Sequence, residues 1–332
     1  MARQVPTARR RSDRPPGRHE RVGVRTGREF SAADLQQRIF QTDKRIEGDS
    51  VDCYVPGHTE SECIPGSSGK GGLIIANSFS SGARSDRDND KLRWCADAVT
   101  SRGFGVKRKL LSPATTATLS AELDIAASSG KGVQIVHTDD IRGIRKIKDL
   151  ARNSETIALL ATTGIPAELA SLCLTTEVRL VAVTAWMKPA TTGAPKPPHQ
   201  DAAHWLHMAP LEFVTIWIAI DRADIANGCL HFVPDSHRSG VHHHVRSTQD
   251  GASALVIPDW REAGEPVELE PGDASAHLGT TVHWSGRNAT GVPRRGIGFS
   301  YCRADARSSL PELDIRSLRL CRTASSTAQE RR

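Results

Sequence analysis

Two side chains that often bind metal ions, His199 and Asp201, are separated by one residue, Gln200. On an extended strand, residues two apart point to the same face, so this imidazole and this carboxylate can converge on one ion. A third ligand must come from elsewhere in the chain. Two histidines and one carboxylate leave three neighbouring coordination positions open, which is the arrangement of non-haem Fe(II) oxygenases. The same three ligands also suit zinc, so a zinc hydrolase is an alternative at this point.

Most of the histidines lie close to this pair in the sequence, since ten of the thirteen fall between His199 and His283. Three of them are consecutive, at positions 242–244, and follow a glycine in a polar segment. That context predicts a solvated loop rather than a metal site. His231 and His237 are expected to have structural roles. Position alone therefore does not select the third ligand.

A series of short motifs accompanies the pair in a fixed order. The motifs are Pro198-His199-Gln200-Asp201, Trp217-x-Ala219-x-Asp221, Asn227-Gly228-Cys229-Leu230, Pro234-Asp235-Ser236-His237, Pro271-Gly272-Asp273, His283-x-Ser285-x-x-Asn288 and Arg294-Arg295. This series resembles the phytanoyl-CoA dioxygenase family, whose members are iron- and 2-oxoglutarate-dependent hydroxylases built on a double-stranded β-helix. The resemblance extends from about residue 103 to residue 304 and is strongest from His199 onward.

The resemblance implies a complete set of iron ligands. His283 matches the distal ligand of the family and would join His199 and Asp201. It leaves His277, six residues earlier, as a residue of a strand or a wall. Halogenating relatives resemble this chain except for a small residue in place of the carboxylate, so the presence of Asp201 disfavours halogenation.

The resemblance also implies how 2-oxoglutarate is held. Arg294 lies eleven residues after His283, where the family has the arginine that binds the far carboxylate of this cosubstrate. A planar guanidinium can bind a carboxylate through two parallel hydrogen bonds, which gives the match a physical basis. Arg295 is the poorer candidate, because successive residues of a strand face opposite sides.

Three further positions match residues around the cosubstrate. Ser285 matches a hydroxyl that helps to hold the same carboxylate. Trp217 matches an aromatic residue that lines the cosubstrate pocket, and a core tryptophan on an apolar strand is an equally good interpretation. Lys146 resembles an upstream lysine near the cosubstrate, with an ordinary solvated lysine as the alternative.

The chain departs from the family at a few positions. Asp235 stands where the family usually has glycine, and we expect this to alter a turn rather than the chemistry. His204 replaces a position often held by other residues. Because they are close to the iron motif, His204 and Trp205 are candidates for contact with the substrate. Asn288 begins a glycosylation sequon, but the family motif already explains this asparagine.

The second half of the chain is predicted to form strands. After Glu177, short runs rich in β-branched and aromatic residues alternate with turn clusters such as Pro271-Gly272-Asp273, which is typical of a sandwich or jelly roll. The predicted strands cover residues 180–187, 213–220, 229–233, 254–257, 266–269, 274–278 and 296–301. With the resemblance, the predicted fold is mostly β with flanking helices around a double-stranded β-helix (jelly-roll, cupin-like) core, whose strands occupy about residues 178–304.

Helices are predicted before these strands. The apolar positions Leu92, Cys95, Ala96 and Val99 repeat at helical spacing, as expected for an amphipathic helix. The predicted helices cover residues 32–40, 87–101, 116–127 and 154–174, the last interrupted near Gly164. Helices followed by strands, without an internal repeat, predict one oxygenase domain at residues 29–310 and a C-terminal tail at 311–332.

The basic charge of the chain is concentrated at its N-terminus. The 332 residues carry a formal net charge of +6. Residues 1–28 contain nine arginines and two acidic residues, a net +7, so the rest of the chain sums to −1. A segment with this composition and no apolar periodicity is predicted to be a disordered tail. A nucleic-acid partner is therefore not expected.

Composition also indicates a soluble, intracellular protein. The mean hydropathy is −0.38, no apolar run is expected to reach the roughly 18 residues of a membrane span, and no apolar segment follows the N-terminal arginines as in a secretory signal. The seven cysteines are odd in number, scattered and never spaced C-x-x-C, which argues against a disulfide scaffold and a cysteine zinc site. Cys229 is predicted to be a core thiol, and the expected location is the cytoplasm.

The sequence therefore predicts an Fe(II)- and 2-oxoglutarate-dependent dioxygenase. It would use dioxygen to hydroxylate an unactivated C–H bond of a small molecule, with secondary-metabolite biosynthesis as one expected setting and a monomer or weak homodimer as the expected assembly. The same iron site could instead perform desaturation, epimerisation or ring formation. A non-catalytic ligand-binding jelly roll is the alternative outside enzymes. It is disfavoured because every ligand and Arg294 are retained, and a zinc hydrolase would leave Arg294 and Ser285 without a role.

Overall fold

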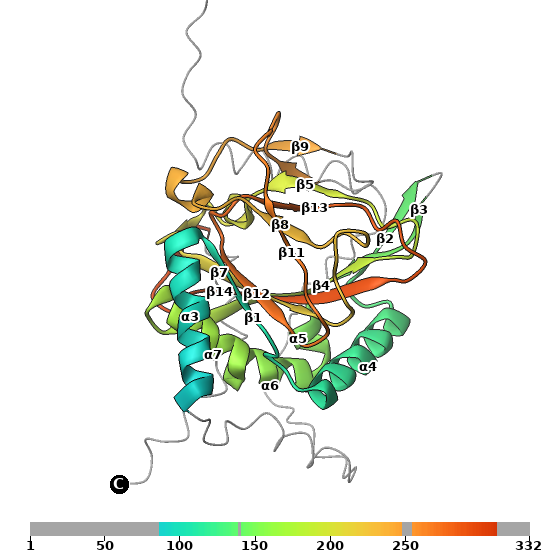
Figure 1. Ribbon diagram of the computed structural model, residues 1–332, viewed down its shortest axis with the longest axis horizontal. Helices are drawn as coiled ribbons and strands as arrows, with labels where there is room; N and C mark the ends of the chain where they lie inside the picture. Colours follow the sequence, from blue (N-terminus) through green and yellow to red (C-terminus); the bar gives the residue numbers. More distant parts are fainter. Residues whose placement is uncertain (1–85, 139–140, 248–253, 311–332) are drawn as a thin grey trace, which may run out of the picture.

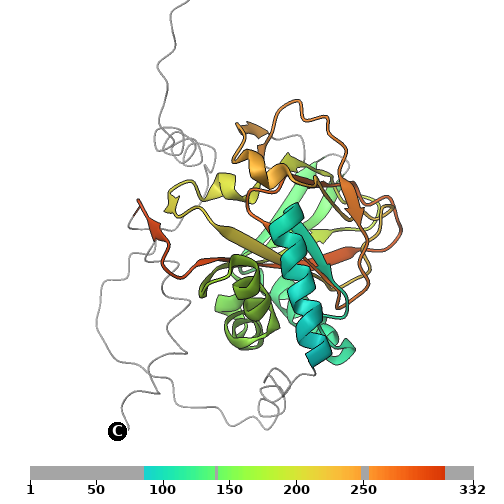
Figure 2. The same ribbon diagram turned by 60° about the vertical axis from the view of Figure 1, so that its left-hand side comes forward.

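The computed structural model describes residues 86–138, 141–247 and 254–310 (Figure 1). Its strands form two main sheets that face one another, and helices cover the outer face of the larger sheet (Figures 1 and 2). The predicted jelly-roll core with flanking helices is thereby confirmed. The predicted helix at residues 32–40 and both predicted tails lie outside the described residues.

The larger sheet has seven strands in the order β1-β12-β7-β14-β4-β3-β2, and every pairing in it is antiparallel. Its members are β1 (Phe104–Lys107), β2 (Val133–Thr138), β3 (Ile141–Ile147), β4 (Val178–Lys188), β7 (Phe213–Ala219), β12 (Ala274–Leu278) and β14 (Arg294–Arg303). The long pair β4 and β14 lies near its middle. This sheet therefore separates the helical layer from the smaller sheet.

The smaller sheet has four strands in the order β11-β8-β13-β5. Its members are β5 (Lys196–His199), β8 (Leu230–Phe232), β11 (Glu265–Val267) and β13 (His283–Ser285). Two further pairs complete the strands, β9 (Val245–Ser247) with β10 (Ala254–Val256) and β6 (Met208–Ala209) with β15 (Arg307–Ser308). Short 3-10 helices η1 (Asp201–His204) and η2 (Ser236–Ser239) follow β5 and β8.

Five helices precede β4 in the described part of the chain. They are α3 (Asp86–Arg102), α4 (Pro113–Ser129), α5 (Leu150–Asn153), α6 (Glu155–Thr163) and α7 (Ile165–Leu174). Local signals fix their ends: the Ser112 hydroxyl accepts a hydrogen bond from Thr115 N at the start of α4, and Gly130 ends that helix with a φ of 70°. These are the usual N-cap and left-handed C-cap. The helices predicted at residues 87–101, 116–127 and 154–174 are confirmed.

Strand β7 shows how one element serves both layers. Val214, Ile216 and Ile218 pack in the main core under the helices. Trp217 belongs instead to a second apolar cluster between the two sheets. All seven residues of β7 are buried because both of its faces are covered. Along such a strand of the larger sheet, every second residue therefore faces the site, and the residues between them pack in the main core.

Helices α6 and α7 together form one stretch, residues 155–174, that is long and apolar enough to cross a membrane by length and composition alone, with a mean hydropathy of 1.7. It is the one such stretch among the described residues, and it corrects the expectation that no run of this kind exists. The stretch is broken at Gly164, and Pro166 lies in the first turn of α7. Leu160 and Leu169 pack fully buried in the main core. The stretch therefore behaves as core helices of the fold.

Several strands carry no periodic signal in the sequence. β1, β2 and β3 precede residue 178 and extend the larger sheet at its two ends. β5 and β13 are only four and three residues long, too short for alternation to be recognised. β2 and β3 pair with one another as neighbours in the sequence, whereas β1, β5 and β13 pair with strands that are distant in the sequence. β5 and β13 carry residues of the candidate site.

Candidate metal site and its surroundings

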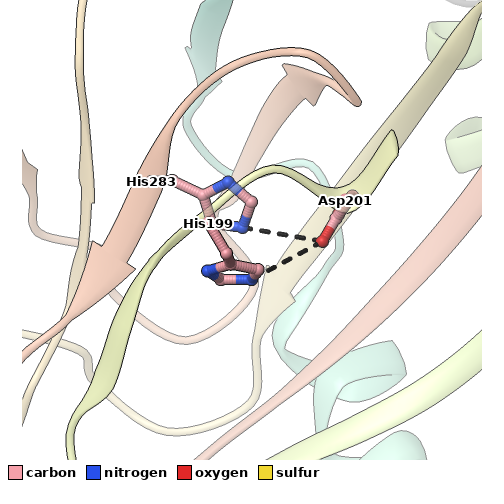
Figure 3. Close-up of side chains that lie close together, drawn as sticks. All are labelled: His199, Asp201 and His283. Carbon is pink, nitrogen blue, oxygen red and sulfur yellow. Dashed lines mark ion pairs between the residues drawn. The ribbon is translucent and has the colours of Figure 1, made fainter. Parts of the chain in front are cut away.

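His199, Asp201 and His283 converge at the end of the smaller sheet (Figure 3). The Oδ1 atom of Asp201 lies 3.7 Å from Nε2 of His199 and 3.7 Å from Nε2 of His283. His199 ends β5, Asp201 begins η1, and His283 begins β13 directly opposite His199 in the register of the two strands. The spacing of the first pair and the strand pairing of the third residue therefore build a possible metal site.

Both histidines present the same nitrogen to the shared space. Nδ1 of His199 is 3.0 Å from the carbonyl oxygen of Pro197, and Nδ1 of His283 is 3.0 Å from that of Thr281. A carbonyl can only accept, so each Nδ1 donates and each Nε2 keeps its lone pair. Burial lowers the pKa of His199 well below its usual range and that of His283 to about 4. Both rings are neutral near pH 7, which is the form that binds metals.

Asp201 supplies the negative charge of the cluster. Burial alone would raise its pKa, but the hydrogen bond from His277 and the nearby imidazoles outweigh burial and hold the pKa well below its usual range. Its Oδ2 atom accepts from the Thr215 hydroxyl at 3.0 Å and from Nε2 of His277 at 3.3 Å. Oδ1 is thus left for the space between the two ligand histidines. His277 was predicted to be a residue of a strand or a wall of the site, and its contact with Asp201 was not predicted.

Gln200, between two of these residues, fastens the site to two loops. Its buried side chain donates to the carbonyls of Gly240 and Thr280 and accepts from the backbone N–H of His242. Its own backbone N–H donates to Nε2 of His244 at 3.0 Å. Residues 242–244 lie in a loop, as predicted, but His242 and His244 are half-buried and contact Gln200 instead of being fully solvated. His243 is exposed as predicted.

Arg294 is a buried cation beyond the metal ligands. Its residue is 2% exposed, its Nη2 donates to the carbonyl of Gly228 at 2.8 Å, and its guanidinium lies 5.2 Å from the centre of the Trp217 ring. Its Nε atom has no hydrogen-bond partner among the described residues. Burial lowers its pKa to about 10, so it is charged near pH 7. A buried cation with an unused donor favours binding of an anion.

Arg295 lies on the other face of β14, as strand alternation predicts. Its guanidinium forms two hydrogen bonds of 2.9 Å with the carboxylate of Asp221 and also contacts Ser120 and Asp124 of α4. Asp221 is therefore committed to Arg295. Within the described part of the chain, no carboxylate forms an ion pair with Arg294, and the two arginines have separate partners.

Two tryptophans lie on the site-facing side of β14, over its glycines. A Cβ added to Gly296 would lie 2.0 Å from the Trp217 ring, and one added to Gly298 would lie 3.4 Å from Nε1 of Trp186. The ammonium group of Lys146 lies 5.2 Å from the centre of the Trp186 ring. The glycines therefore leave room for both indoles on this face of the strand. Trp186 escaped sequence reasoning, although Gly296 and Gly298 facing one side were a usable signal.

The remaining predicted site residues have mixed surroundings. Ser285 is buried two residues after His283 and faces the same side of β13. His204 is exposed at the end of η1. Trp205 stacks on Phe213 with ring centres 5.5 Å apart and belongs to a small apolar cluster. Ser285 therefore lies on the same strand as the ligand His283, and Trp205 packs against Phe213.

Several motif residues build turns rather than contact the site. The side-chain amide of Asn288, fully buried, donates to the carbonyls of Lys188, Pro189 and Val292. It thereby ties the loop before Arg294 to the end of β4. Asp235 adopts a φ of 62°, a left-handed conformation that glycine takes freely and aspartate tolerates. Asp235 therefore lies in a turn whose backbone conformation also suits glycine.

The site and the fold both have relatives of known description. Residues 100–296, more than half of the chain, match the family described as Phytanoyl-CoA dioxygenase (PhyH). A probable alpha-ketoglutarate-dependent hypophosphite dioxygenase of Stutzerimonas stutzeri is 34% identical over 122 residues, which are 35% of this chain and 42% of that protein. The match spans about two fifths of the length of this and the next two curated relatives.

Solved structures share the fold over most of the described residues. EvdO2 from Micromonospora carbonacea var. aurantiaca, complexed with 2-oxoglutarate, is 26% identical with a TM-score of 0.54, covering 69% of this chain and 95% of that one. The epimerase SnoN, in complex with Fe3+, alpha ketoglutarate and nogalamycin RO, is 24% identical with a TM-score of 0.56, covering 68% and 90%. Both are similar to this chain in the jelly-roll core.

Proposed function

The chain belongs to the phytanoyl-CoA dioxygenase family, and on this premise we propose that it is an Fe(II)- and 2-oxoglutarate-dependent oxygenase acting on a small molecule. The observation that carries the proposal is the combination of two neutral histidines and one carboxylate with a buried arginine whose Nε has no hydrogen-bond partner among the described residues. The first suits a divalent iron. The second suits the far carboxylate of a dicarboxylate cosubstrate. A ligand-binding protein or a zinc hydrolase would need only the first.

The residues present fit both groups. His199 and His283 would bind iron through Nε2, and Asp201 through Oδ1. Arg294 would hold the far carboxylate of 2-oxoglutarate, which would satisfy its unused Nε. When bound, these groups couple the oxidation of a substrate C–H bond by dioxygen to the conversion of 2-oxoglutarate into succinate and CO2. The protein's part is ligation, orientation and exclusion of water.

Further residues are proposed around the cosubstrate. Ser285, on the same side of its strand as His283, would help Arg294 to hold the far carboxylate. Trp217 lies against the Arg294 guanidinium and would form one wall of the pocket. Lys146, whose ammonium group lies over the Trp186 ring, would lie near the opposite end of the pocket. His204, exposed three residues after Asp201, is proposed to face the substrate.

Hydroxylation of an unactivated C–H bond is the proposed outcome, with secondary-metabolite biosynthesis as the proposed setting. Desaturation, epimerisation and ring formation would use the same residues and are alternatives. The mass of the product separates three classes, because hydroxylation adds one oxygen atom, desaturation and oxidative ring formation each remove two hydrogens, and epimerisation leaves the mass unchanged. The NMR spectrum of the product separates desaturation from ring formation. The descriptions of two proteins named above mention chemically different compounds, hypophosphite and nogalamycin RO, so the substrate is sought by screening small molecules.

We further propose a cytoplasmic monomer or weak homodimer that binds neither nucleic acid nor membrane. The four cysteines of the described residues are all buried free thiols, and burial raises the pKa of Cys229 to about 11. Reduced thiols and a ferrous ion are both favoured by a reducing compartment. Cys229 is fully buried, which confirms the predicted core thiol.

The proposal is tested by reconstitution. Metal-free protein is loaded with Fe(II) under anaerobic conditions, 2-oxoglutarate is added, and oxygen uptake and succinate are measured after exposure to air. We expect slow succinate formation without a substrate, none with Zn(II), and none from Asp201→Ala. Anaerobic calorimetry should show 2-oxoglutarate binding only to the metal-loaded protein. Failure of the Fe(II)-loaded protein to bind 2-oxoglutarate would overturn the proposal.

A further inference from the structure

Three polar residues lie side by side on the site-facing surface of the larger sheet. His277 of β12 is directly opposite Thr215 of β7, and Thr215 is directly opposite Ser300 of β14. They are neighbours across three adjacent strands. His277 and Thr215 both contact the same atom of one candidate ligand, Oδ2 of Asp201. We call these three residues the polar rung.

The hydrogen bonds of the polar rung have a defined direction. A carboxylate only accepts, so the Thr215 hydroxyl donates its one proton to Asp201 at 3.0 Å. The 3.1 Å contact between the hydroxyls of Thr215 and Ser300 must then run from Ser300 to Thr215 because each hydroxyl has one proton. Two hydroxyls in series polarise one another and strengthen the bond to the carboxylate. Ser300 therefore acts on Asp201 through Thr215.

His277 is fixed in the orientation that reaches Asp201. Its ring is 2% exposed and lies between Phe232 and His283, with ring centres 4.9 and 4.6 Å away. Its Nε2 is 3.3 Å from Oδ2 of Asp201, while its Nδ1 has no hydrogen-bond partner among the described residues. A buried ring nitrogen without a partner is unfavourable. The hydrogen bond from Nε2 to Asp201 compensates for the unpaired Nδ1 in this orientation of the ring.

We propose that the polar rung positions Asp201, holding Oδ2 so that only Oδ1 faces the space between His199 and His283. The inference rests on the proposed metal site. A carboxylate free to rotate could offer both oxygens to the metal and fill a position that the reactants need. With Oδ2 held by two donors, the carboxylate contributes one atom and leaves three positions open. His277, Thr215 and Ser300 are positioning residues, because they would act on the metal through Asp201.

Metal affinity in variants of Thr215 provides the test. Thr215→Val removes the hydroxyl and keeps the shape, whereas Thr215→Ser keeps the hydroxyl. Metal-free protein is titrated with Co(II), and the visible absorption of Co(II) reports affinity and coordination. We expect Thr215→Val to weaken Co(II) binding about 10- to 100-fold, as is typical for partners of metal ligands, and to change the spectrum. Thr215→Ser should bind as the wild type does, and Ser300→Ala should lose less than Thr215→Val.

Two further variants complete the design. His277→Phe removes the second donor and fills similar space, and we expect a loss of Co(II) affinity comparable to that of Thr215→Val. Thr116→Val is the matched control, because Thr116 is equally buried but donates to the Ser112 carbonyl at the start of α4. It should leave the Co(II) affinity and spectrum unchanged. The melting temperature of each metal-free variant shows whether the fold is intact.

The outcomes separate this inference from the metal site on which it rests. If the wild-type protein binds no Co(II), the proposed metal site fails. If the wild type binds and folded Thr215→Val binds equally well with the same spectrum, the polar rung has no positioning role and the inference is overturned. Equal weakening in Thr215→Ser and Thr215→Val would overturn it as well, because the hydroxyl would then not be the cause.

Discussion

Exchanging the two adjacent arginines for glutamine, one at a time, should separate cosubstrate binding from folding stability. Arg294 and Arg295 are neighbours in the sequence but lie on opposite faces of β14. We expect Arg294→Gln to weaken 2-oxoglutarate binding strongly and Arg295→Gln to leave it nearly unchanged. We expect the reverse order for the melting temperature of the metal-free protein. Each variant is the matched control of the other.

The magnitudes follow from the partners of each side chain. Truncating one partner of a buried, hydrogen-bonded charge pair costs about 2–5 kcal/mol, which weakens 2-oxoglutarate binding by between about 30-fold and a few thousand-fold. Without cosubstrate, Arg294 is a buried charge without an ion-pair partner among the described residues, so neutralising it should not lower stability. Arg295→Gln removes charged hydrogen bonds to Asp221, worth roughly 1.5–3 kcal/mol, and should lower the melting temperature by several degrees.

Two measurements decide the matter. Anaerobic titration of 2-oxoglutarate into Fe(II)-loaded protein gives Kd, and thermal unfolding of metal-free protein gives Tm. If Arg295→Gln loses the cosubstrate and Arg294→Gln does not, the faces of β14 are assigned the wrong way round. If neither variant changes Kd, the role assigned to Arg294 is refuted and with it the physical basis for 2-oxoglutarate.

Two other predictions concern glycine and pH. Gly296→Ala should weaken 2-oxoglutarate binding because its Cβ would lie 2.0 Å from the Trp217 ring, whereas Gly298→Ala, with a nearest contact of 3.4 Å, should have little effect in the same titration. Burial alone would raise the pKa of Asp273, but hydrogen bonds from Lys109, Arg108 and Glu270 lower it. A lowered folded pKa adds stability above the unfolded value near 4 that is lost as the pH falls through the folded value. Asp273→Asn should therefore unfold more easily at pH 7, and its deficit against the wild type in urea titrations should shrink below about pH 4; a deficit independent of pH would contradict this.

The sequence by itself determined those parts of the site that depend on local spacing. His199 and Asp201 converge because the intervening Gln200 is extended, so residues two apart share a face. Arg294 and Arg295 separate for the same reason. The ordered motifs identified the family, and the resemblance to the family identified His283 as the third ligand. The motifs are informative because several of their residues build the turns that connect the strands. The long helices were predictable because their apolar periodicity is local.

Only the tertiary structure decided which residues surround the ligands. His277 and Thr215 reach Asp201 through the register of β12 and β7, and register depends on pairing between segments about sixty residues apart. The contact between His244 and Gln200 also joins segments that are distant in the sequence, and it was not predicted. The residue type of a histidine does not reveal which residue it will contact in the folded protein.

Charge compensation was likewise decided in three dimensions. The adjacent arginines are chemically identical, yet Asp221 pairs with Arg295 and leaves Arg294 with an unused donor. Short strands such as β5 and β13 also escaped prediction, because three or four residues cannot show a period. Their stability comes from neighbours across the sheet. Sequence fixes what each residue can do within a few positions, and long-range pairing decides which groups meet and which remain available for a ligand.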